Sequence, residues 1–173
     1  ISLVIMDQSN GHVVAIVGGR GAKEGSRTLN RATDSARQPG STFKVLSTYA
    51  PALDSAGMTL ATVFNDAPFN YNDGTPVHNW YSNPPYEGLS SIRKGIYHSM
   101  NIVTVKCLTQ ITPKLGFDYL EDFGFTTLNE LNDCYQPMAL GGVGGVTNLE
   151  LCAAYATIAN GGVYNEPQFY KIG

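Results

Sequence analysis

Charged residues are scarce in this sequence of 173 residues, because Asp, Glu, Lys and Arg together make up only 14% of it. An ordinary soluble domain contains roughly 25%. The formal net charge is −3 and the basic residues do not cluster. This argues against nucleic acid as a partner, since neutralising phosphates requires a basic stripe, and it argues equally against an electrostatic membrane patch. The polar surface must be largely uncharged.

Long apolar runs are also lacking. No stretch approaches the ~20 apolar residues of a membrane span, and the first residues do not have the pattern of a signal peptide. The chain opens inside the alternating run Ser2–Met6 and stops just as an extended segment begins at Tyr170. We therefore expect residues 1–173 to be a piece of a longer protein. If that protein is exported, its targeting segment lies outside this chain.

The chain has few cysteines, and their spacing does not suggest pairs. The three cysteines, Cys107, Cys134 and Cys152, form no C-x-x-C pair. An odd number without such a pair predicts neither a disulfide framework nor a zinc site. We interpret them as small thiols buried in helices. A cysteine nucleophile acting with one of the three histidines is the alternative, which no neighbouring residue supports.

Apolar residues make up 43% of the chain, enough for one core and a prior of about one domain. Two β-rich runs, residues 3–6 and 12–17, flank Asn10-Gly11, a pattern that predicts an antiparallel hairpin. The composition of residues 18–40 predicts a loop with a short helix near 30–36.

The middle of the chain alternates between helix and loop signals. Apolar residues at helical spacing predict a helix that begins at Ser41. Residues 65–88 are rich in Asn, Asp, Pro and Gly, and we predict a long irregular loop that its aromatic residues keep ordered. Trp80, Tyr81 and Tyr86 either line a cleft or only fix this loop, and the sequence leaves the two alternatives even.

The remaining helices are predicted over residues 90–98, 102–111, 112–123 and 147–160. The last one opens on a capping box from Thr147 to Glu150. The glycine run 141–145 before it indicates a tight turn rather than a phosphate cradle, because no Lys-Ser/Thr pair follows. Two strands and five or six helices without a repeat predict an α/β-type sheet protein seen without most of its sheet.

A hydroxyl and an amine come together in Ser41-Thr42-Phe43-Lys44, an S-x-x-K pattern at a predicted helix start. Residues three apart share a helix face, so a neutral amine would accept the proton as the hydroxyl attacks. The helix N-terminus favours the developing negative charge. Roughly 0.4 chance matches are expected in a chain of this composition, and Ser91-Ile92-Arg93-Lys94 is a second match. The Pro39-Gly40 turn before Ser41 favours the first, and we interpret Ser91 as a helix N-cap region.

Six short segments follow one another in a distinctive order: Gly18-Gly19-Arg20, Asn30-Arg31-Ala32, Arg37-Gln38-Pro39-Gly40-Ser41-Thr42-Phe43-Lys44, Tyr86-Glu87-Gly88, the S-x-N pattern Ser99-Met100-Asn101, and Ala154-Tyr155-Ala156-Thr157-Ile158-Ala159-Asn160-Gly161-Gly162. In residues and order they resemble the transpeptidase domain of penicillin-binding proteins, from the first residue to about Tyr170. Asn-Arg-Ala followed by Arg-Gln-Pro-Gly-Ser is most similar to the bifunctional class A members, which carry a glycosyltransferase domain and a membrane anchor before this domain.

The resemblance implies a fold and a reaction. The fold would be α/β (α+β), an antiparallel sheet flanked by helices as in serine β-lactamases, of which this chain holds the first hairpin and the helical part. The reaction would be D-Ala-D-Ala transpeptidation, with peptidoglycan stem peptides as substrates and β-lactam antibiotics as inhibitors. It would need no metal and no organic cofactor. Ser41 would be the acylated nucleophile and Lys44 its general base; Ser99 would pass the proton to the leaving D-alanine, and Asn101 would hold Lys44 and the substrate amide. The whole protein would act at the extracytoplasmic face of the bacterial cell membrane, anchored by a segment outside this chain.

One element of the family pattern is missing. After Asn101 the lysines are Lys106, Lys114 and Lys171, and Lys171-Ile172-Gly173 has the wrong middle residue for the K-T-G strand. We therefore expect residues 1–173 to be a partial transpeptidase domain without that strand and the later sheet strands, which would supply the carboxylate clamp and half of the oxyanion hole, the other half being the backbone N–H of Ser41.

Two alternatives stay open. A serine β-lactamase of class A would carry S-D-N and E-x-x-L-N, whereas this chain has Met100 in the first pattern and Glu130-Leu131-Asn132 in place of the second. A non-catalytic sensor module would be acylated by penicillins without turnover, and the sequence is compatible with it.

Overall fold

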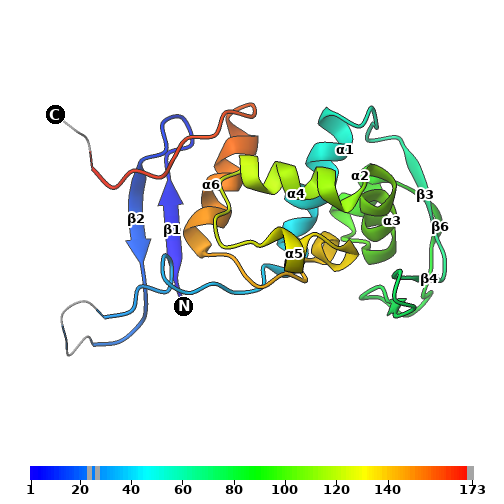
Figure 1. The fold of residues 1–173 in the computed structure, drawn as a ribbon, viewed down its shortest axis with the longest axis horizontal. Helices are drawn as coiled ribbons and strands as arrows, with labels where there is room; N and C mark the ends of the chain where they lie inside the picture. Colours follow the sequence, from blue (N-terminus) through cyan, green and yellow to red (C-terminus); the bar gives the residue numbers. More distant parts are fainter. Residues whose placement is uncertain (23–24, 26–27, 171–173) are drawn as a thin grey trace. The chain divides into compact units, whose positions relative to one another are not determined.

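The predicted hairpin is confirmed in the computed structural model, which describes residues 1–22, 25 and 28–170. Strands β1 (Leu3–Met6) and β2 (Val13–Val17) are antiparallel, with Leu3 opposite Val17. Helix α6 (Asn148–Ala159) packs along β1 (Figure 1). The helix faces the strand with Cys152, whose Sγ lies 3.9 Å from the Val4 carbonyl.

These elements belong to one of two compact units, made of residues 1–38, 120–128 and 144–173. The capping box that begins α6 is confirmed, since the Thr147 hydroxyl accepts from the Glu150 backbone N–H (3.2 Å) and the Glu150 carboxylate accepts from the Thr147 N–H (2.9 Å). The prediction of a short helix near residues 30–36 is wrong. A turn takes its place, closed by the N–H of Asp34 on the carbonyl of Asn30 (2.8 Å), since an Asn that bonds its own neighbourhood favours a turn.

The second unit comprises residues 39–119 and 129–143. Its first helical segment runs through the 3₁₀ turn η1 (Gly40–Thr42), the π-helical turn η2 (Val45–Tyr49) and α1 (Ala50–Asp54). The sequence explains why the helical hydrogen-bond pattern changes along this segment: Pro51 has no N–H to donate to the carbonyl four residues earlier. That carbonyl, of Ser47, instead approaches Gly116, where a Cβ would lie 2.3 Å from it.

Helix α3 (Asn101–Ile111) is the centre of this unit and is buried over most of its length. It is packed by η2, by α2 (Ile92–Tyr97) and by the 3₁₀ turn η3 (Gln136–Leu140). Tyr49 reaches it with its hydroxyl, 2.7 Å from the Thr104 hydroxyl. Helix α2 comes close to the same tyrosine only because Gly95 has no side chain, since a Cβ there would lie 2.5 Å from the Tyr49 oxygen.

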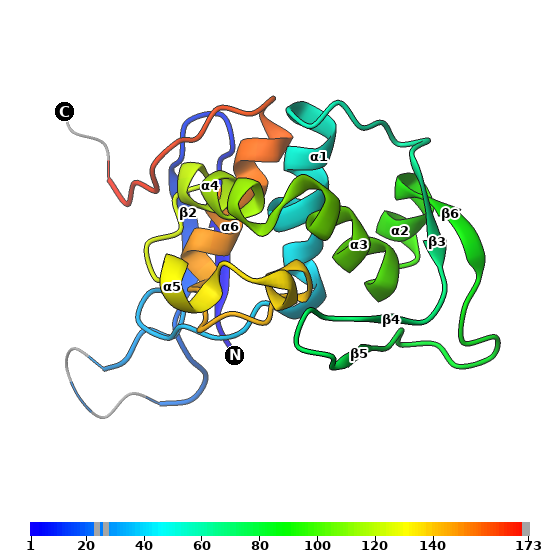
Figure 2. The same ribbon diagram turned by 45° about the vertical axis from the view of Figure 1, so that its right-hand side comes forward.

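The prediction of an irregular loop over residues 65–88 is wrong in part. Strands β3 (Val63–Asp66) and β6 (Gly88–Ser91) bracket the loop as an antiparallel pair, and β4 (Phe69–Asn70) and β5 (Pro76–Val77) form a hairpin inside it (Figure 2). The described residues therefore hold six strands in three two-stranded sheets rather than two strands. Partners more than twenty residues apart leave no local pattern in the sequence.

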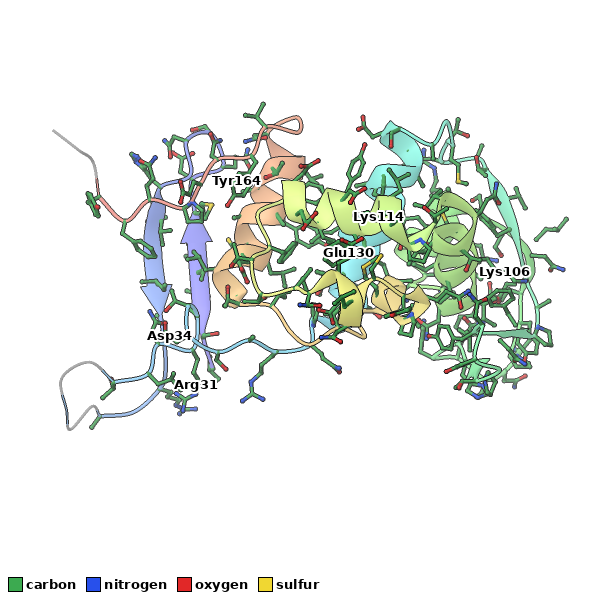
Figure 3. The ribbon with its side chains drawn as sticks, viewed as in Figure 1. Arg31, Asp34, Lys106, Lys114, Glu130 and Tyr164 are labelled. Carbon is green, nitrogen blue, oxygen red and sulfur yellow. The ribbon has the colours of Figure 1, made fainter. Side chains whose placement is uncertain are left out.

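Two more helices complete the unit's described elements, α4 (Pro113–Asp122), of which residues 113–119 belong here, and α5 (Glu130–Asp133). Lys106, labelled in Figure 3, ties α3 to β3 by donating from Nζ to the carbonyl of Asn65 (2.6 Å). No helix among the described residues is long and apolar enough to span a membrane.

The described cysteines form no disulfide: Cys107 is buried in α3, while Cys134 and Cys152 are half-buried. The interpretation as buried helical thiols is thus confirmed for Cys107 alone. The triplet Lys171-Ile172-Gly173, discussed above for its likeness to K-T-G, lies outside the described residues.

Candidate active site

The helix that carries Ser41 and Lys44 begins at a sharp turn. Gly40 has a φ of +59°, and a Cβ on Gly141 would lie 2.4 Å from the Gly40 nitrogen, so both positions require glycine. The Thr42 hydroxyl closes the turn on the Pro39 carbonyl (2.6 Å). Ser41 is left exposed in the first turn, where a ligand outside the core can reach its hydroxyl.

Lys44, one turn further, points inward and is only 3% exposed. Its Nζ donates to the Ser99 carbonyl (2.7 Å), the Ser99 hydroxyl (3.0 Å) and the Asn101 Oδ1 (2.6 Å). The structure thus brings three of the four predicted site residues into direct contact, although Lys44 is more than fifty residues from the other two. Among the described contacts, Ser41 makes no hydrogen bond with Lys44, so the two are related only by their place on one helical turn.

The environment of Lys44 changes its acidity. Burial lowers the pKa of Lys44 from 10.5 to about 8, because desolvation penalises the ammonium form. Its described acceptors are a carbonyl, a hydroxyl and an amide oxygen, none of which carries a full negative charge. About a tenth of the amine is therefore neutral at pH 7, far more than for an ordinary lysine, and this fraction can accept a proton.

Ser99 sits in a strained turn between α2 and α3. Its φ is +51°, a left-handed conformation that costs a non-glycine residue about 1–3 kcal/mol. The turn is held by hydrogen bonds from the N–H of Ser99 to Ile96 (3.2 Å) and of Met100 to Gly95 (3.0 Å). Met100 is fully buried. As a result the carbonyl and the hydroxyl of Ser99 both face Lys44.

Asn101 is the first residue of α3, and its side chain has one possible orientation. Its Nδ2 donates to the carbonyl of His78 (2.7 Å), which can only accept. Oδ1 must then face Lys44, as observed.

Sequence reasoning missed three residues that support this arrangement. His78 holds the Asn101 side chain, Asn79 accepts from the Asn101 backbone N–H (3.1 Å), and the buried Asp66 accepts from Asn79 (2.9 Å). All three lie within the segment 65–88, which was predicted to be an ordered loop. The polar composition of this segment was the only signal in the sequence. Composition does not show which of its polar residues contacts α3.

The aromatic residues of this segment also lie beside Ser99. Trp80 donates from Nε1 to the carbonyl of His98 (2.9 Å), and Tyr81 donates from its hydroxyl to Asp66 (2.7 Å). The rings of Tyr81 and His98 are 4.9 Å apart. Both aromatic residues thus fix the loop, and Trp80 also leaves 66% of its surface exposed, available to a bound molecule.

The second S-x-x-K match has a different environment. The Ser91 hydroxyl accepts from the Lys94 backbone N–H (3.2 Å), so Ser91 is the N-cap of α2 as interpreted. The Lys94 amine pairs with Glu87 (2.6 Å) and is 31% exposed. Since this pairing raises the pKa of Lys94, its amine remains charged and is unsuited to act as a base.

Glu130, which stands in the segment compared with the β-lactamase motif, is already engaged. Figure 3 labels it beside Lys114, and the carboxylate and amine are 2.9 Å apart. The described residues contain no group of three or more His, Cys, Asp or Glu side chains placed to hold a metal ion.

Comparison with known proteins finds one family over almost the whole chain. The model of the penicillin-binding protein transpeptidase domain matches residues 1–172. Penicillin-binding protein 1A of Clostridium tetani is 34% identical, covering 98% of this chain and 23% of the relative. Penicillin-binding protein 1A of Escherichia coli is also 34% identical, covering 97% and 19%. The chain thus spans about a fifth of the length of these relatives.

Solved structures have the same fold. The crystal structure of penicillin-binding protein 1A from Haemophilus influenzae superposes with a TM-score of 0.83 at 32% identity, over 96% of this chain and 24% of that one. A penicillin-binding protein from Mycobacterium tuberculosis, at 22% identity, gives 0.79 over 96% and 44% and supports the fold alone. The expected α/β fold is confirmed, and the chain belongs to the penicillin-binding protein transpeptidase domain family.

Proposed function

We propose that this chain carries the serine acyl-transfer centre of a D-Ala-D-Ala transpeptidase that cross-links peptidoglycan. The observation that carries the proposal is the buried Lys44 amine in contact with Ser99 and Asn101, one turn after an exposed Ser41. A lowered amine pKa, a nucleophile at a helix start and a second hydroxyl on the amine are the groups that acyl transfer needs.

The proposed reaction proceeds in two steps. In the first, Ser41 Oγ attacks the carbonyl of the penultimate D-alanine while Lys44 accepts the hydroxyl proton. The bond to the terminal D-alanine breaks, and Ser99 passes a proton from Lys44 to the leaving nitrogen. Asn101 holds Lys44 and binds the substrate amide.

In the second step an amine of a neighbouring stem peptide attacks the acyl-enzyme. The amine gives up its proton through the same groups, a new amide forms, and Ser41 regains its hydroxyl. A penicillin would acylate Ser41 and remain attached, because its acyl-enzyme hydrolyses slowly. The chemistry uses no metal and no organic cofactor.

The proposal also covers the domains, the anchor and the strand that would accompany these residues in the whole protein. The class A character, which rests on the Asn30-Arg31-Ala32 and Arg37–Ser41 segments, implies a glycosyltransferase domain and an anchor that places the enzyme at the extracytoplasmic face of the membrane. We also propose that residues 1–173 form part of the catalytic domain and that a K-T-G strand from further sequence completes the oxyanion hole and binds the substrate carboxylate.

The test is labelling of the full-length polypeptide with a fluorescent penicillin. We expect a stable adduct at Ser41 that is lost in Ser41→Ala and kept in the matched variant Ser91→Ala. Rapid turnover of the penicillin would instead identify a β-lactamase. A stable adduct without cross-linking of stem peptides would identify a sensor module, and labelling that survives Ser41→Ala would contradict the proposed nucleophile.

A further inference from the structure

A buried carboxylate is connected to the start of helix α3 through two successive hydrogen bonds. Asp66, the last residue of β3, is 1% exposed. Its Oδ1 accepts from Asn79 Nδ2 (2.9 Å), and its Oδ2 accepts from the Tyr81 hydroxyl (2.7 Å) and the Glu87 backbone N–H (2.8 Å). Asp66 is in none of the ion pairs of the described residues. Burying a charge without a cation is costly unless the group is hydrogen-bonded, and these three donors cover both carboxylate oxygens.

This carboxylate determines which way the Asn79 amide points, together with the more distant Pro85 carbonyl, which also accepts from Asn79 Nδ2 (3.3 Å). An ionised carboxylate only accepts, so Asn79 must face it with its NH₂ group. The Asn79 oxygen then points to α3, where it accepts from the backbone N–H groups of Asn101 (3.1 Å) and Ile102 (3.3 Å).

Those two N–H groups need a partner from outside the helix. The first N–H groups of any helix have no partner within it, and Met100, the N-cap residue of α3, provides no side-chain hydrogen bond. Asn79 therefore caps α3 from another segment of the chain. The preceding residue, His78, fixes the side chain of the same Asn101 through its carbonyl, so two neighbouring residues hold both the backbone and the amide of Asn101.

We propose that Asp66 and Asn79 are positioning residues for Lys44: the buried carboxylate orients the Asn79 amide, which holds the start of α3 so that Asn101 Oδ1 meets the Lys44 amine. The proposal rests on the proposed role of Ser41 and Lys44 in acyl transfer. Neither residue touches substrate. Their effect is on where Lys44 stands when it accepts the proton.

The variant Asp66→Asn tests the orientation directly. The new amide must turn its oxygen to the Glu87 N–H, which only donates, and so presents its NH₂ group to Asn79. Asn79 must then rotate, which sets its own NH₂ against the N–H groups of Asn101 and Ile102. We expect acylation by a fluorescent penicillin to slow by about 10- to 100-fold, since misplacing a catalytic group by about 1 Å costs up to about 100-fold.

The reversed pair supplies a rescue. Asn79→Asp alone sets two carboxylates against each other and should slow acylation as well. In the double variant Asp66→Asn/Asn79→Asp, residue 79 accepts from the amide at 66 with one oxygen and from α3 with the other, and a helix N-terminus favours the anion. We expect this variant to acylate faster than either single variant, a coupling that independent sites would not show, although residue 79 no longer donates to the Pro85 carbonyl.

A control variant separates positioning from loss of stability. Thr109→Val removes a hydroxyl from the last turn of the same helix, where it accepts from Gln136 Nε2 (2.7 Å). It weakens α3 far from Lys44 and should leave acylation unchanged. A second measurement, hydrogen exchange of the amides of Asn101 and Ile102, should quicken in Asp66→Asn and recover in the double variant, whether or not the protein is acylated.

The outcomes are distinct. Slow acylation and fast exchange in Asp66→Asn, both restored by the double variant, support the proposal. Parent-like acylation in Asp66→Asn, or a double variant slower than either single one, would overturn it. If the parent itself takes no label at Ser41, the proposed function fails, and the exchange rates alone decide: unchanged exchange at Asn101 and Ile102 overturns the role of Asp66 and Asn79 as well.

Discussion

The chain contains the same S-x-x-K spacing twice, at Ser41–Lys44 and at Ser91–Lys94, and the two sites differ in what surrounds the amine. Lys44 is buried among uncharged oxygens and burial lowers its pKa to about 8. Lys94 is partly exposed and paired with Glu87, which raises its pKa. The same serine and lysine spacing thus gives a candidate base in one place and a solvated helix start in the other. Spacing alone does not define this chemistry; desolvation and partners do.

Removing each amine in turn should give the largest difference between the two sites. We expect Lys44→Ala to slow labelling by a fluorescent penicillin by about 10²- to 10⁴-fold, the usual contribution of a general base. Lys94→Ala should leave the rate unchanged, because its amine only pairs with Glu87. The measurement is the second-order rate constant of adduct formation in the full-length polypeptide. Equal effects of the two substitutions would show that burial of Lys44 has no part in the reaction.

The pH dependence should sharpen the same contrast. If neutral Lys44 is the base, its protonation removes activity, so labelling should rise with pH and level off above the folded-state pKa of about 8. Below that pKa the neutral fraction falls about tenfold per pH unit. The matched variant is Glu87→Gln, which removes the partner that raises the pKa of Lys94.

Glu87→Gln should not move the midpoint of the labelling profile, since Glu87 is not among the described partners of Lys44. A profile that is flat between pH 6 and 9, or a midpoint that follows Glu87→Gln, would assign the titration to another group. Rates are measured with the same fluorescent penicillin across this range.

Much of the local structure could be predicted from the sequence, because its signals are local. The hairpin around Asn10-Gly11, the capping box at Thr147 and the helix opening at Pro113 each depend on residues within a few positions of one another. The pairing of β3 with β6 could not be predicted, since its partners lie more than twenty residues apart and each strand is short.

The candidate site divides in the same way. The resemblance indicated Ser41, Lys44, Ser99 and Asn101, and the structure brings the last three together. Asp66 and Asn79 are ordinary polar residues in a loop-like composition. Their part depends on a buried carboxylate turning an amide toward a helix start in another segment, which no residue pattern within the loop encodes.

The smallest expected difference concerns the serines as helix residues. Ser91 caps α2 through a hydrogen bond from the Lys94 N–H (3.2 Å), and Ser91→Ala should cost about 1 kcal/mol, the usual value for a lost N-cap. Ser41 is exposed and makes no described cap bond, since the turn before it is closed by Thr42. Ser41→Ala should therefore change stability by less than about 0.5 kcal/mol, as most exposed substitutions do, while it abolishes labelling. Urea unfolding of both variants measures the difference in stability. A Ser41→Ala protein less stable than Ser91→Ala would contradict the assignment of the N-cap role to Ser91 and not to Ser41.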